Sequence, residues 1–270
     1  MTDQTPTPIP GQTAVQVVAH PPVLEVTLNR PKANAIDAAT SRELSKVFAA
    51  FRDDPELRVA ILTGGGSRFF SAGWDLNAAA EGEEYEADYG DGGFGGLGEL
   101  PGLNKPVIAA VNGMAVGGGF EIVMAADLVV AADHARFWLP EANLGIVPDA
   151  GSVRLGRMLP PVVANEVLFA GRRLDAAEAL RWGLVNAVVS ADDLMSEARA
   201  LAARVTEAAP LAVAAIAEIR DRTKHLPLAD AFELLRSGGL AAYEAMLVSS
   251  DASEGSSAFA EGRSPRWQGG

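Results

Sequence analysis

The 270-residue sequence contains no cysteine and only three histidines. Without cysteine the chain can form no disulfide and can offer no thiolate as a nucleophile or metal ligand, which fits a reducing compartment. The histidines, His20, His134 and His225, are scattered and lack the spacing of a metal site. We therefore expect no metal site.

Positive charge is scarce, with 22 Lys and Arg against 35 Asp and Glu and a formal net charge of -13. A surface of this sign repels nucleic acid and anionic membranes. No apolar run approaches the roughly 18 residues of a membrane span. Residues 1–11 are polar and lack the basic start and apolar run of a signal peptide. We expect a cytoplasmic protein with neither a nucleic-acid nor a membrane partner.

Motifs for nucleotide binding and for serine nucleophiles are also missing. Gly93, Gly95 and Gly98 match the dinucleotide fingerprint as a string, but they follow acidic residues rather than a strand. The chain has no phosphate loop ending in Gly-Lys-Ser/Thr and no Gly-x-Ser-x-Gly elbow. These absences argue against a nucleotide-dependent enzyme and against an α/β-hydrolase.

Apolar residues make up 49% of the chain, enough for a sizeable core. Hydrophobic patterns and capping residues predict strands and helices that alternate along the chain. The predicted strands cover residues 13–19, 23–29, 58–63, 107–111 and 127–132, and the predicted helices cover 38–52 and about 117–126. This alternation predicts an α/β fold with largely parallel strand pairing.

The pattern becomes helical after about residue 160. Asp175 with Glu178 forms a capping box, Gly183 ends that helix, and Ser190 with Asp193 forms a second box before an Ala-rich stretch. We divide the chain into a flexible N-terminus (1–12), an α/β core (13–190) and a helical C-terminal region (191–270).

Within the core, residues 77–104 form a segment rich in Asp, Glu and Gly, called here the acidic segment. Six glycines fall between residues 90 and 98, directly after a cluster of carboxylates. The composition is typical of a mobile lid over a site and equally of a solvated acidic linker. Both interpretations stay open from the residues alone.

Two stretches rich in small residues each follow a predicted strand. Three glycines at 117–119 open a helix, and residues 69–76 (FFSAGWDL) follow the strand at 58–63. Exposed N–H groups and the positive end of a helix dipole suit negative charge that develops on an oxygen. Tight packing or an ordinary turn would use the same residues. If both stretches meet at one edge of a sheet, they can place two donors on one oxygen.

Two glutamates accompany these stretches. Glu121 lies just beyond the glycines, with Phe120, Ile122 and Val123 as neighbours, and Glu141 follows a Leu-Pro pair. A carboxylate in apolar surroundings has a raised pKa and can act as a general acid or base. A surface position remains the alternative for each residue.

Several motifs together resemble the crotonase superfamily, also called the enoyl-CoA hydratase/isomerase family. They occur in the family's order over about residues 15–269, and they are Leu28-Asn29-Arg30-Pro31 with Ala33-Asn34-Ala35, Ser71-Ala72-Gly73-x-Asp75-Leu76, and Lys105–Gly113 with Gly117–Gly119. The resemblance implies a spiral of ββα turns with a helical C-terminal trimerisation region. It also implies an acyl-CoA substrate, no cofactor beyond the coenzyme A of that substrate, and a homotrimer or a dimer of trimers.

The resemblance assigns roles residue by residue. Ala72 and Gly118 would supply the oxyanion N–H groups, and Glu121 and Glu141 would be the catalytic carboxylates. Because both family acid positions are filled, addition and elimination of water is favoured over isomerisation. The expected substrate-binding residues are Lys32, Ala33, Ala35, Ser71, Gly73, Trp74, Asp75, Leu76, Gly117, Trp138 and Asp149.

Within the family, the runs RPKANAIDAAT, FFSAGWDL and LGIVPDAG resemble dehydratases whose acyl group carries a quaternary ammonium. Aromatic faces and a nearby acid stabilise such a cation. Trp74, Phe120 and Trp138 are the aromatic candidates, and Asp149 with Trp74 would select the cation unless both are structural. Gly262 stands where relatives often have a lysine that reaches coenzyme A phosphate.

Three other functions are kept as alternatives. The first is a general enoyl-CoA hydratase or isomerase acting on simple acyl chains. The second is a chemistry in which Asp149 attacks the acyl group directly. The third is a catalytically silent RNA-binding or scaffold protein, against which the net charge of -13 and both glutamates argue.

Overall fold

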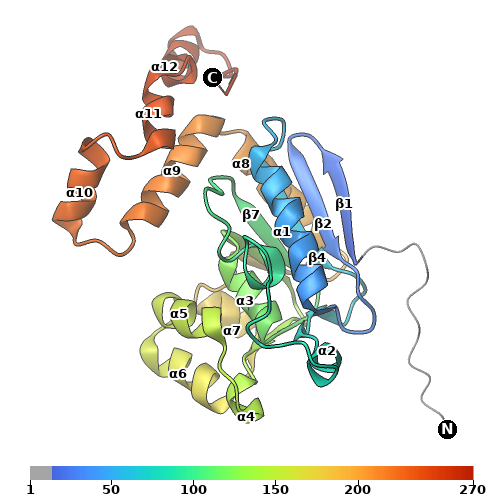
Figure 1. Ribbon diagram of the computed structural model, residues 1–270. Coiled ribbons are helices and arrows are strands. Elements are labelled where there is room, and N and C mark those ends of the chain that lie inside the picture. Colours follow the sequence, from blue (N-terminus) through green and yellow to red (C-terminus); the bar gives the residue numbers. More distant parts are fainter. Residues whose placement is uncertain (1–13, 270) are drawn as a thin grey trace.

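A six-stranded sheet forms the centre of the fold (Figure 1). The structure is a computed structural model that describes residues 14–269, so the expected flexible N-terminus at 1–12 lies outside the described residues. In spatial order the strands are β1 (Val15–His20), β2 (Val23–Leu28), β4 (Val59–Gly64), β7 (Val107–Val111), β9 (Leu128–Ala132) and β12 (Ala187–Val189). Neighbours are parallel except β1 with β2, as the alternation of strands and helices predicts.

Two smaller sheets lie at the carboxyl ends of the central strands. One contains β11 (Leu174–Asp175), β10 (Arg136–Trp138), β8 (Met114–Val116) and β5 (Phe69–Ser71), and the other pairs β3 (Ala35–Ile36) with β6 (Gly73–Trp74). These strands have only two or three residues each, which is too short for a hydrophobic period. The sequence did not predict them.

Helices surround and extend this core. They are α1 (Ala38–Asp53), α2 (Leu76–Ala80), η1 (Phe94–Gly96), α3 (Gly118–Ala125), α4 (Glu141–Leu144), α5 (Asp149–Met158), α6 (Pro161–Ala170), α7 (Ala176–Arg181), α8 (Leu194–Thr206), α9 (Pro210–Thr223), α10 (Leu228–Arg236), α11 (Ala241–Val248) and α12 (Asp251–Glu261). In the described part of the chain no single helix is long and apolar enough to cross a membrane. Only α8 and α9 together meet the length and composition, and they bend by 99° where they join.

The middle strands of the central sheet are buried on both faces, whereas the edge strand β1 is largely exposed. Along β4, Ala60 and Leu62 pack into the cluster on the α1 side, while Val59 and Ile61 pack into the cluster with α8. A parallel strand that is buried on both faces needs a continuous apolar run rather than an alternating one. The run VAIL at the start of β4 satisfies this requirement.

The predicted caps are realised with one shift. The Thr40 N–H donates to Asp37 Oδ1 at 2.7 Å, which begins α1 as expected. The Asp193 N–H donates to the Ser190 hydroxyl oxygen and that hydroxyl donates to Asp193 Oδ2, so both bonds use the Ser190 side chain, and α8 begins only at Leu194. This pair therefore closes a turn before the helix and does not cap the helix itself.

Helices α9 to α12 extend away from the sheet (Figure 1), whereas α8 packs directly on it. The helical region expected from residue 191 thus begins inside the core. The extending helices and the turn between α9 and α10 carry large apolar side chains exposed in this single chain, namely Ile216, Leu226, Leu228, Phe232, Leu247, Val248 and Phe259.

Candidate active site

The two glycine-rich stretches meet at one edge of the fold. Strand β6 pairs with β3, and Gly73 within β6 lies against the first turn of α3. A Cβ atom on Gly73 would stand 2.7 Å from the Gly118 nitrogen and 2.7 Å from the Val116 oxygen, and φ of Gly73 is +80°. Only glycine permits this approach. The predicted convergence of the two stretches is present.

The N–H of Ala72 is not available to a ligand in this arrangement. It donates to the carbonyl oxygen of Ala33 at 2.9 Å. This bond joins residues 30–35 to the segment between β5 and β6. The prediction that Ala72 supplies an oxyanion donor is therefore wrong. The sequence could not show which N–H of FFSAGWDL points inward, because that depends on the pairing with β3.

The pairing identifies Trp74 as the residue whose N–H points away from β3. Its neighbour Asp75 donates its N–H to the Ile36 oxygen at 2.9 Å, and successive amides of a strand point in opposite directions. Helix α3 packs against this other side of β6. Gly118 is the first residue of α3, where N–H groups have no partner inside the helix. The convergent donors are thus Trp74 and Gly118.

Asn34 holds the two loops around these donors together. Its side-chain amide donates to the carbonyl oxygens of Gly65, Phe69 and Phe70 at 3.0, 3.0 and 3.2 Å. The backbone carbonyl oxygen of Asn34 accepts a hydrogen bond from the Ser71 hydroxyl at 2.7 Å. Asn34 is buried and adopts φ of 50°, in the left-handed region that asparagine tolerates. One side chain therefore fixes the position of the segment that carries Trp74.

The other residues expected to bind substrate surround the same edge. Arg30 bridges Asp37 at 2.6 Å and Asp75 at 2.8 Å, which secures the loop that precedes β3. Lys32 and Leu76 are exposed, Ala33, Ala35 and Asp75 are half-buried, and Ser71, Gly73 and Gly117 are buried. The structure brings these residues together along the rim next to the donors.

Glu121 reaches the site from α3. Its Oε1 accepts the Gly151 N–H at 2.7 Å. Burial raises the pKa of Glu121 to about 7, and the nearby Asp149 charge acts in the same direction. The N–H groups of Gly151 and Ala150 and the charge of Arg154 oppose this rise, because they stabilise the ionised form.

Glu141, the first residue of α4, is only 7% exposed. Burial raises its pKa to about 7, and the charges of Glu121 and Asp149 add to the rise. Its Oε2 is buried and accepts no hydrogen bond from residues 14–269. A Cβ on Gly117 would stand 2.5 Å from Glu141 Oε1, so the carboxyl group lies beside the donor end of α3.

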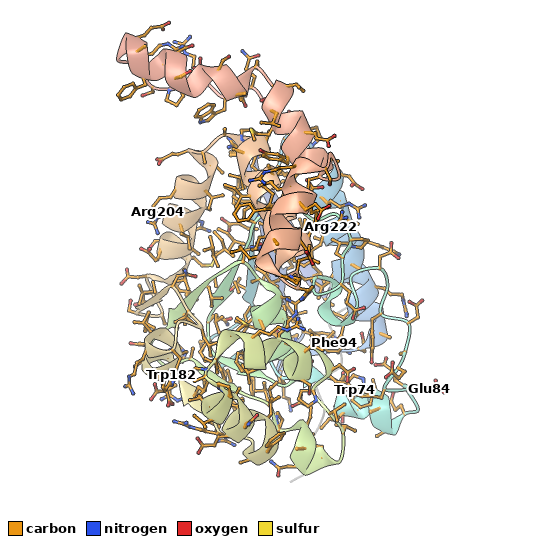
Figure 2. All side chains as sticks on the ribbon, turned by 90° about the vertical axis from the view of Figure 1, so that its left-hand side faces the viewer. Trp74, Glu84, Phe94, Trp182, Arg204 and Arg222 are labelled. Carbon is orange, nitrogen blue, oxygen red and sulfur yellow. The ribbon has the colours of Figure 1, made fainter. Side chains whose placement is uncertain are left out.

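A cavity of about 430 Å³ joins these groups. Its lining includes Trp74, Gly118, Glu121, Glu141 and Asp149. The acidic segment forms another part of its wall, and Figure 2 shows Trp74 and Phe94 nearer the centre of the molecule than Glu84 at its outer edge. The lining residues that this segment contributes are Tyr85, Glu86, Tyr89, Phe94, Gly98 and Glu99.

Two predicted aromatic candidates do not line this cavity. The Trp138 ring lies 4.7 Å from the Arg173 guanidinium, and only the Trp138 carbonyl serves the site, by accepting the Gly117 N–H at 3.0 Å. Phe120 is buried against Phe137 with ring centroids 5.4 Å apart. Their ring orientations follow from the packing of β10 and α3, which the sequence order of the residues does not reveal.

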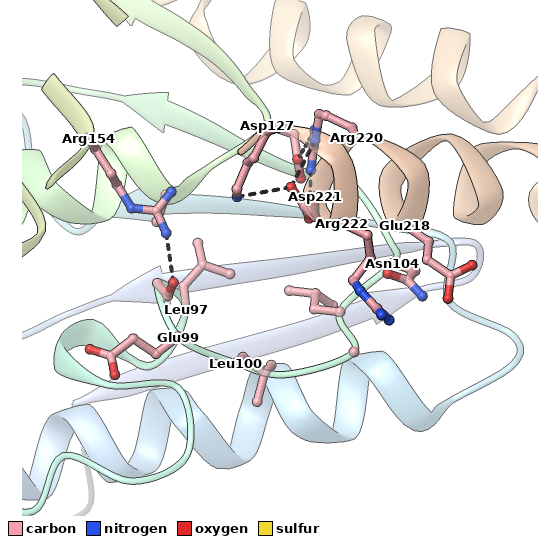
Figure 3. A pocket seen from close by; sticks show the side chains of 15 residues that line it. Leu97, Glu99, Leu100, Asn104, Asp127, Arg154, Glu218, Arg220, Asp221 and Arg222 are labelled. Carbon is pink, nitrogen blue, oxygen red and sulfur yellow. Dashed lines mark hydrogen bonds and ion pairs between the residues drawn. The ribbon is translucent and has the colours of Figure 1, made fainter. Parts of the chain in front are cut away.

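A second cavity of about 370 Å³ adjoins the first beneath α9 (Figure 3). Arg154 borders both cavities and donates to the Gly98 oxygen at 2.7 Å. Arg220 of α9 is already paired here, since it contacts Asp127 at 2.7 Å and Asp221 at 3.2 Å. Arg154 thus forms a partition between the two spaces.

Within residues 14–269 no group of three or more His, Cys, Asp or Glu side chains could hold a metal ion. A model of a protein family described as enoyl-CoA hydratase/isomerase matches residues 19–270. The chain belongs to the enoyl-CoA hydratase/isomerase family. The resemblance to the crotonase superfamily is thereby confirmed.

Members of this family with similar sequences include two named carnitinyl-CoA dehydratase. The protein from Citrobacter koseri is 61% identical over 251 residues, spanning 93% of this chain and 96% of the relative. The protein from Proteus mirabilis is 60% identical over 248 residues, spanning 92% of this chain and 95% of the relative.

Solved structures of family members share the fold. Enoyl-CoA hydratase from Mycobacterium tuberculosis H37Rv superposes with a TM-score of 0.87 at 38% identity, covering 96% of this chain and all (100%) of the other. Enoyl-CoA hydratase from Bacillus anthracis gives a TM-score of 0.85 at 33% identity, covering 96% and 100%. The predicted α/β crotonase fold is confirmed.

Proposed function

We propose that this family member is a hydro-lyase that interconverts carnitinyl-CoA and crotonobetainyl-CoA by eliminating and adding water at C2–C3. The observation that carries the proposal is a pair of glutamates with raised pKa, Glu141 buried and Glu121 half-buried, on one cavity with two convergent N–H donors. The similarity to proteins named carnitinyl-CoA dehydratase supports this acyl group.

The N–H groups of Trp74 and Gly118 would hold the thioester carbonyl oxygen. When a proton leaves or joins C2, negative charge develops on that oxygen as an enolate. Donors fixed beforehand stabilise this charge without rearrangement, and loss of one such donor typically costs a factor of about 10²–10³ in rate. Binding of the carbonyl oxygen by these two N–H groups would place C2 and C3 of the acyl group next to the two glutamates.

We infer the resting protonation states of the glutamates from their contacts. Glu121 accepts the Gly151 N–H and lies near Arg154, which both favour its carboxylate form. Glu141 has a buried Oε2 with no hydrogen-bond partner among the described residues, which favours its neutral form. Because the charge of Glu121 raises the pKa of Glu141, the pair would hold one proton near neutral pH, on Glu141.

Hydration of the enoyl group would begin from this state. The Glu121 carboxylate takes a proton from water, whose oxygen bonds to C3. The carboxylic acid of Glu141 gives its proton to C2, and the enolate collapses to the thioester. The proton has then moved from Glu141 to Glu121, and elimination of water runs through the same steps in reverse.

Coenzyme A would enter as part of the substrate, with residues 30–35 along its path, and this chemistry requires no separate cofactor. We also propose a homotrimer or a dimer of trimers, because α9 to α12 expose apolar side chains such as Phe232 and Phe259. Light scattering coupled to size exclusion checks the assembly, and a monomer would contradict it.

The test is the absorbance change of the enoyl-thioester band with crotonobetainyl-CoA and crotonyl-CoA in parallel, with Glu141→Gln as the inactive control. A higher kcat/KM for crotonobetainyl-CoA supports the proposal. A preference for crotonyl-CoA would instead indicate a general hydratase. Double-bond migration without hydration would indicate an isomerase, and an acyl-enzyme trapped on Asp149 would indicate direct attack by that residue. No reaction with either substrate would indicate a different acyl group or another reaction of the superfamily, and salt-dependent RNA binding would indicate a silent family member.

A further inference from the structure

One wall of the acyl cavity is built from aromatic rings of the acidic segment and its neighbour Trp74. The rings of Trp74 and Tyr85 meet edge to face, with centroids 5.3 Å apart and planes at 77°. Those of Tyr89 and Phe94 meet in the same way, at 5.3 Å and 82°. All four residues line the cavity that holds both glutamates. Such a wall offers ring faces and edges close to the reacting carbons.

Hydrogen bonds hold these rings in place. Trp74 Nε1 donates to Glu83 Oε1 at 2.9 Å, and Glu83 Oε2 accepts the Ala38 N–H at the start of α1 at 2.9 Å. The Tyr89 hydroxyl donates to the Tyr85 carbonyl oxygen at 2.8 Å. The acidic segment is therefore attached to the core at this wall.

The Tyr85 hydroxyl connects the wall to Asp149. It lies within hydrogen-bonding reach of the Val147 carbonyl oxygen and 3.1 Å from Asp149 Oδ1. Burial and the charge of Asp149 raise the pKa of Tyr85 well above its usual value, so the hydroxyl remains a donor. The Asp149 carboxylate is thus directed to the same cavity as the Tyr85 ring.

The charge on the cavity lining has one dominant sign. Of the described residues that line it, five carry carboxyl groups, of which only Glu141 would be neutral, and one, Arg154, is a cation. The Arg154 guanidinium is already bonded to the Gly98 oxygen. The five acidic residues are Glu86, Glu99, Glu121, Glu141 and Asp149. A neutral acyl chain gains nothing from this excess of negative charge, whereas a cationic one is stabilised by it.

A quaternary ammonium has no N–H to donate, so it is recognised by aromatic faces and by unbonded negative charge. In crotonobetaine its nitrogen is two bonds from C3, the carbon that the glutamates must serve. The charge of Asp149 is felt by both glutamates, so Asp149 is close to the same carbon. The cation of the substrate would therefore lie between Asp149 and the aromatic wall.

We propose that the rings of Tyr85 and Trp74 and the carboxylate of Asp149 form the binding site for the quaternary ammonium of the acyl group. Tyr85 is the specificity-determining residue, because it supplies a ring and also directs Asp149. This inference rests on the proposed function, which it extends from the reaction to the group that selects the substrate. It adds a loop residue that the sequence motifs do not include.

The experiment compares crotonobetainyl-CoA with 5,5-dimethylhex-2-enoyl-CoA, in which carbon replaces the charged nitrogen and the shape is kept. The variants are Asp149→Asn, Tyr85→Leu and Tyr85→Phe, with Glu84→Gln as a charge control on an exposed residue of the same segment that does not line the cavity. The readout is the ratio of kcat/KM for the cationic substrate to that for the neutral one.

We expect Asp149→Asn and Tyr85→Leu each to lower this ratio by about tenfold or more, because each removes a stabilising group. Tyr85→Phe keeps the ring and should retain most of the preference, and Glu84→Gln should leave the ratio as in the wild type. If both Asp149→Asn and Tyr85→Leu keep the ratio within about twofold, the proposed site is overturned.

Binding separates this inference from the proposed reaction. The dissociation constants of the two thioesters are measured by calorimetry in the Glu141→Gln background, with circular dichroism as the check on folding. Tighter binding of the cationic thioester that weakens in Asp149→Asn supports the site even if the hydro-lyase activity fails. Equal binding of both thioesters overturns the site even if hydration is observed.

Discussion

Replacement of Gly73 by alanine tests the oxyanion arrangement most directly. The new Cβ would stand 2.7 Å from both the Gly118 nitrogen and the Val116 oxygen. Because favourable contacts of carbon begin at roughly 3.5 Å, β6 and α3 must separate by about 0.8 Å. A displacement near 1 Å at a reacting centre costs about 10²-fold in rate, and the loss of a donor costs up to about 10³-fold. We expect kcat to fall within that range.

The positive φ of Gly73 adds a loss of stability that has to be separated from the loss of catalysis. A side chain at such an angle costs about 1–2 kcal/mol. Gly183 provides the matched control, since its φ is +77° and no described atom lies within 4 Å of its added Cβ. Gly183→Ala should lower the free energy of unfolding by about 1–2 kcal/mol and leave kcat unchanged.

The assay combines urea denaturation with the rate of enoyl-thioester absorbance change at saturating substrate. If Gly73→Ala folds and its kcat stays within about threefold of the wild type, the Trp74 and Gly118 N–H groups are not the oxyanion donors. If Gly183→Ala loses as much activity as Gly73→Ala, backbone strain rather than donor geometry explains the result.

Three further predictions concern the two glutamates, Arg154 and the hydrogen bonds of Asn34. The pKa of Glu121 and of Glu141 is raised from 4.5 to about 7, so their contribution to stability is present below pH 4.5 and lost as pH rises through 7. In urea titrations the Glu141→Gln variant should therefore lose less unfolding free energy between pH 5 and 8 than the wild type loses. An equal loss would contradict the assignment. Arg154→Met removes a charge that lowers the pKa of Glu121, so the acidic limb of the kcat/KM profile should move to higher pH, and an unmoved or lowered limb would refute this. Asn34→Ala removes the side-chain donor of the Gly65 and Phe70 carbonyl oxygens, while the Phe69 oxygen keeps its bond from the Asn112 amide. The change should cost about 3 kcal/mol in chemical denaturation together with a fall in kcat; stability within error of the wild type would show that Asn34 does not hold the loops.

The central sheet and α1 were predictable because their signals are local. The run VAIL of β4 and the Asp37 cap each depend on a few adjacent residues, and the structure contains both elements. The strands β3, β6 and β8 gave no such signal, because two or three residues cannot establish a period. Their pairing partners are distant in sequence, and these strands can be recognised only from that pairing.

The candidate site was predictable as a set of segments and less so as individual groups. The stretch around FFSAGWDL was expected beside the glycines of α3, but the donor shifts by two positions, from Ala72 to Trp74. That shift depends on the bond from the Asp75 N–H to the Ile36 oxygen, which no local pattern encodes. Tyr85 was not predicted for the same reason, since its orientation depends on contacts with residues 147–149.

The hydrogen bonds of Asn34 also suggest how the site can respond to the distant end of a large substrate. Asn34 lies in the loop expected to meet coenzyme A, and it bonds Gly65 and Phe70 through its amide and Ser71 through its backbone carbonyl, just before the strand that carries Trp74. Ordering of that loop by the nucleotide would then tighten the position of the donor some residues away. Binding energy gained at the distant end of the substrate would then raise the rate of reaction at C2 and C3. A thioester shortened to its pantetheine arm would keep every reacting atom and still be processed more slowly at saturation.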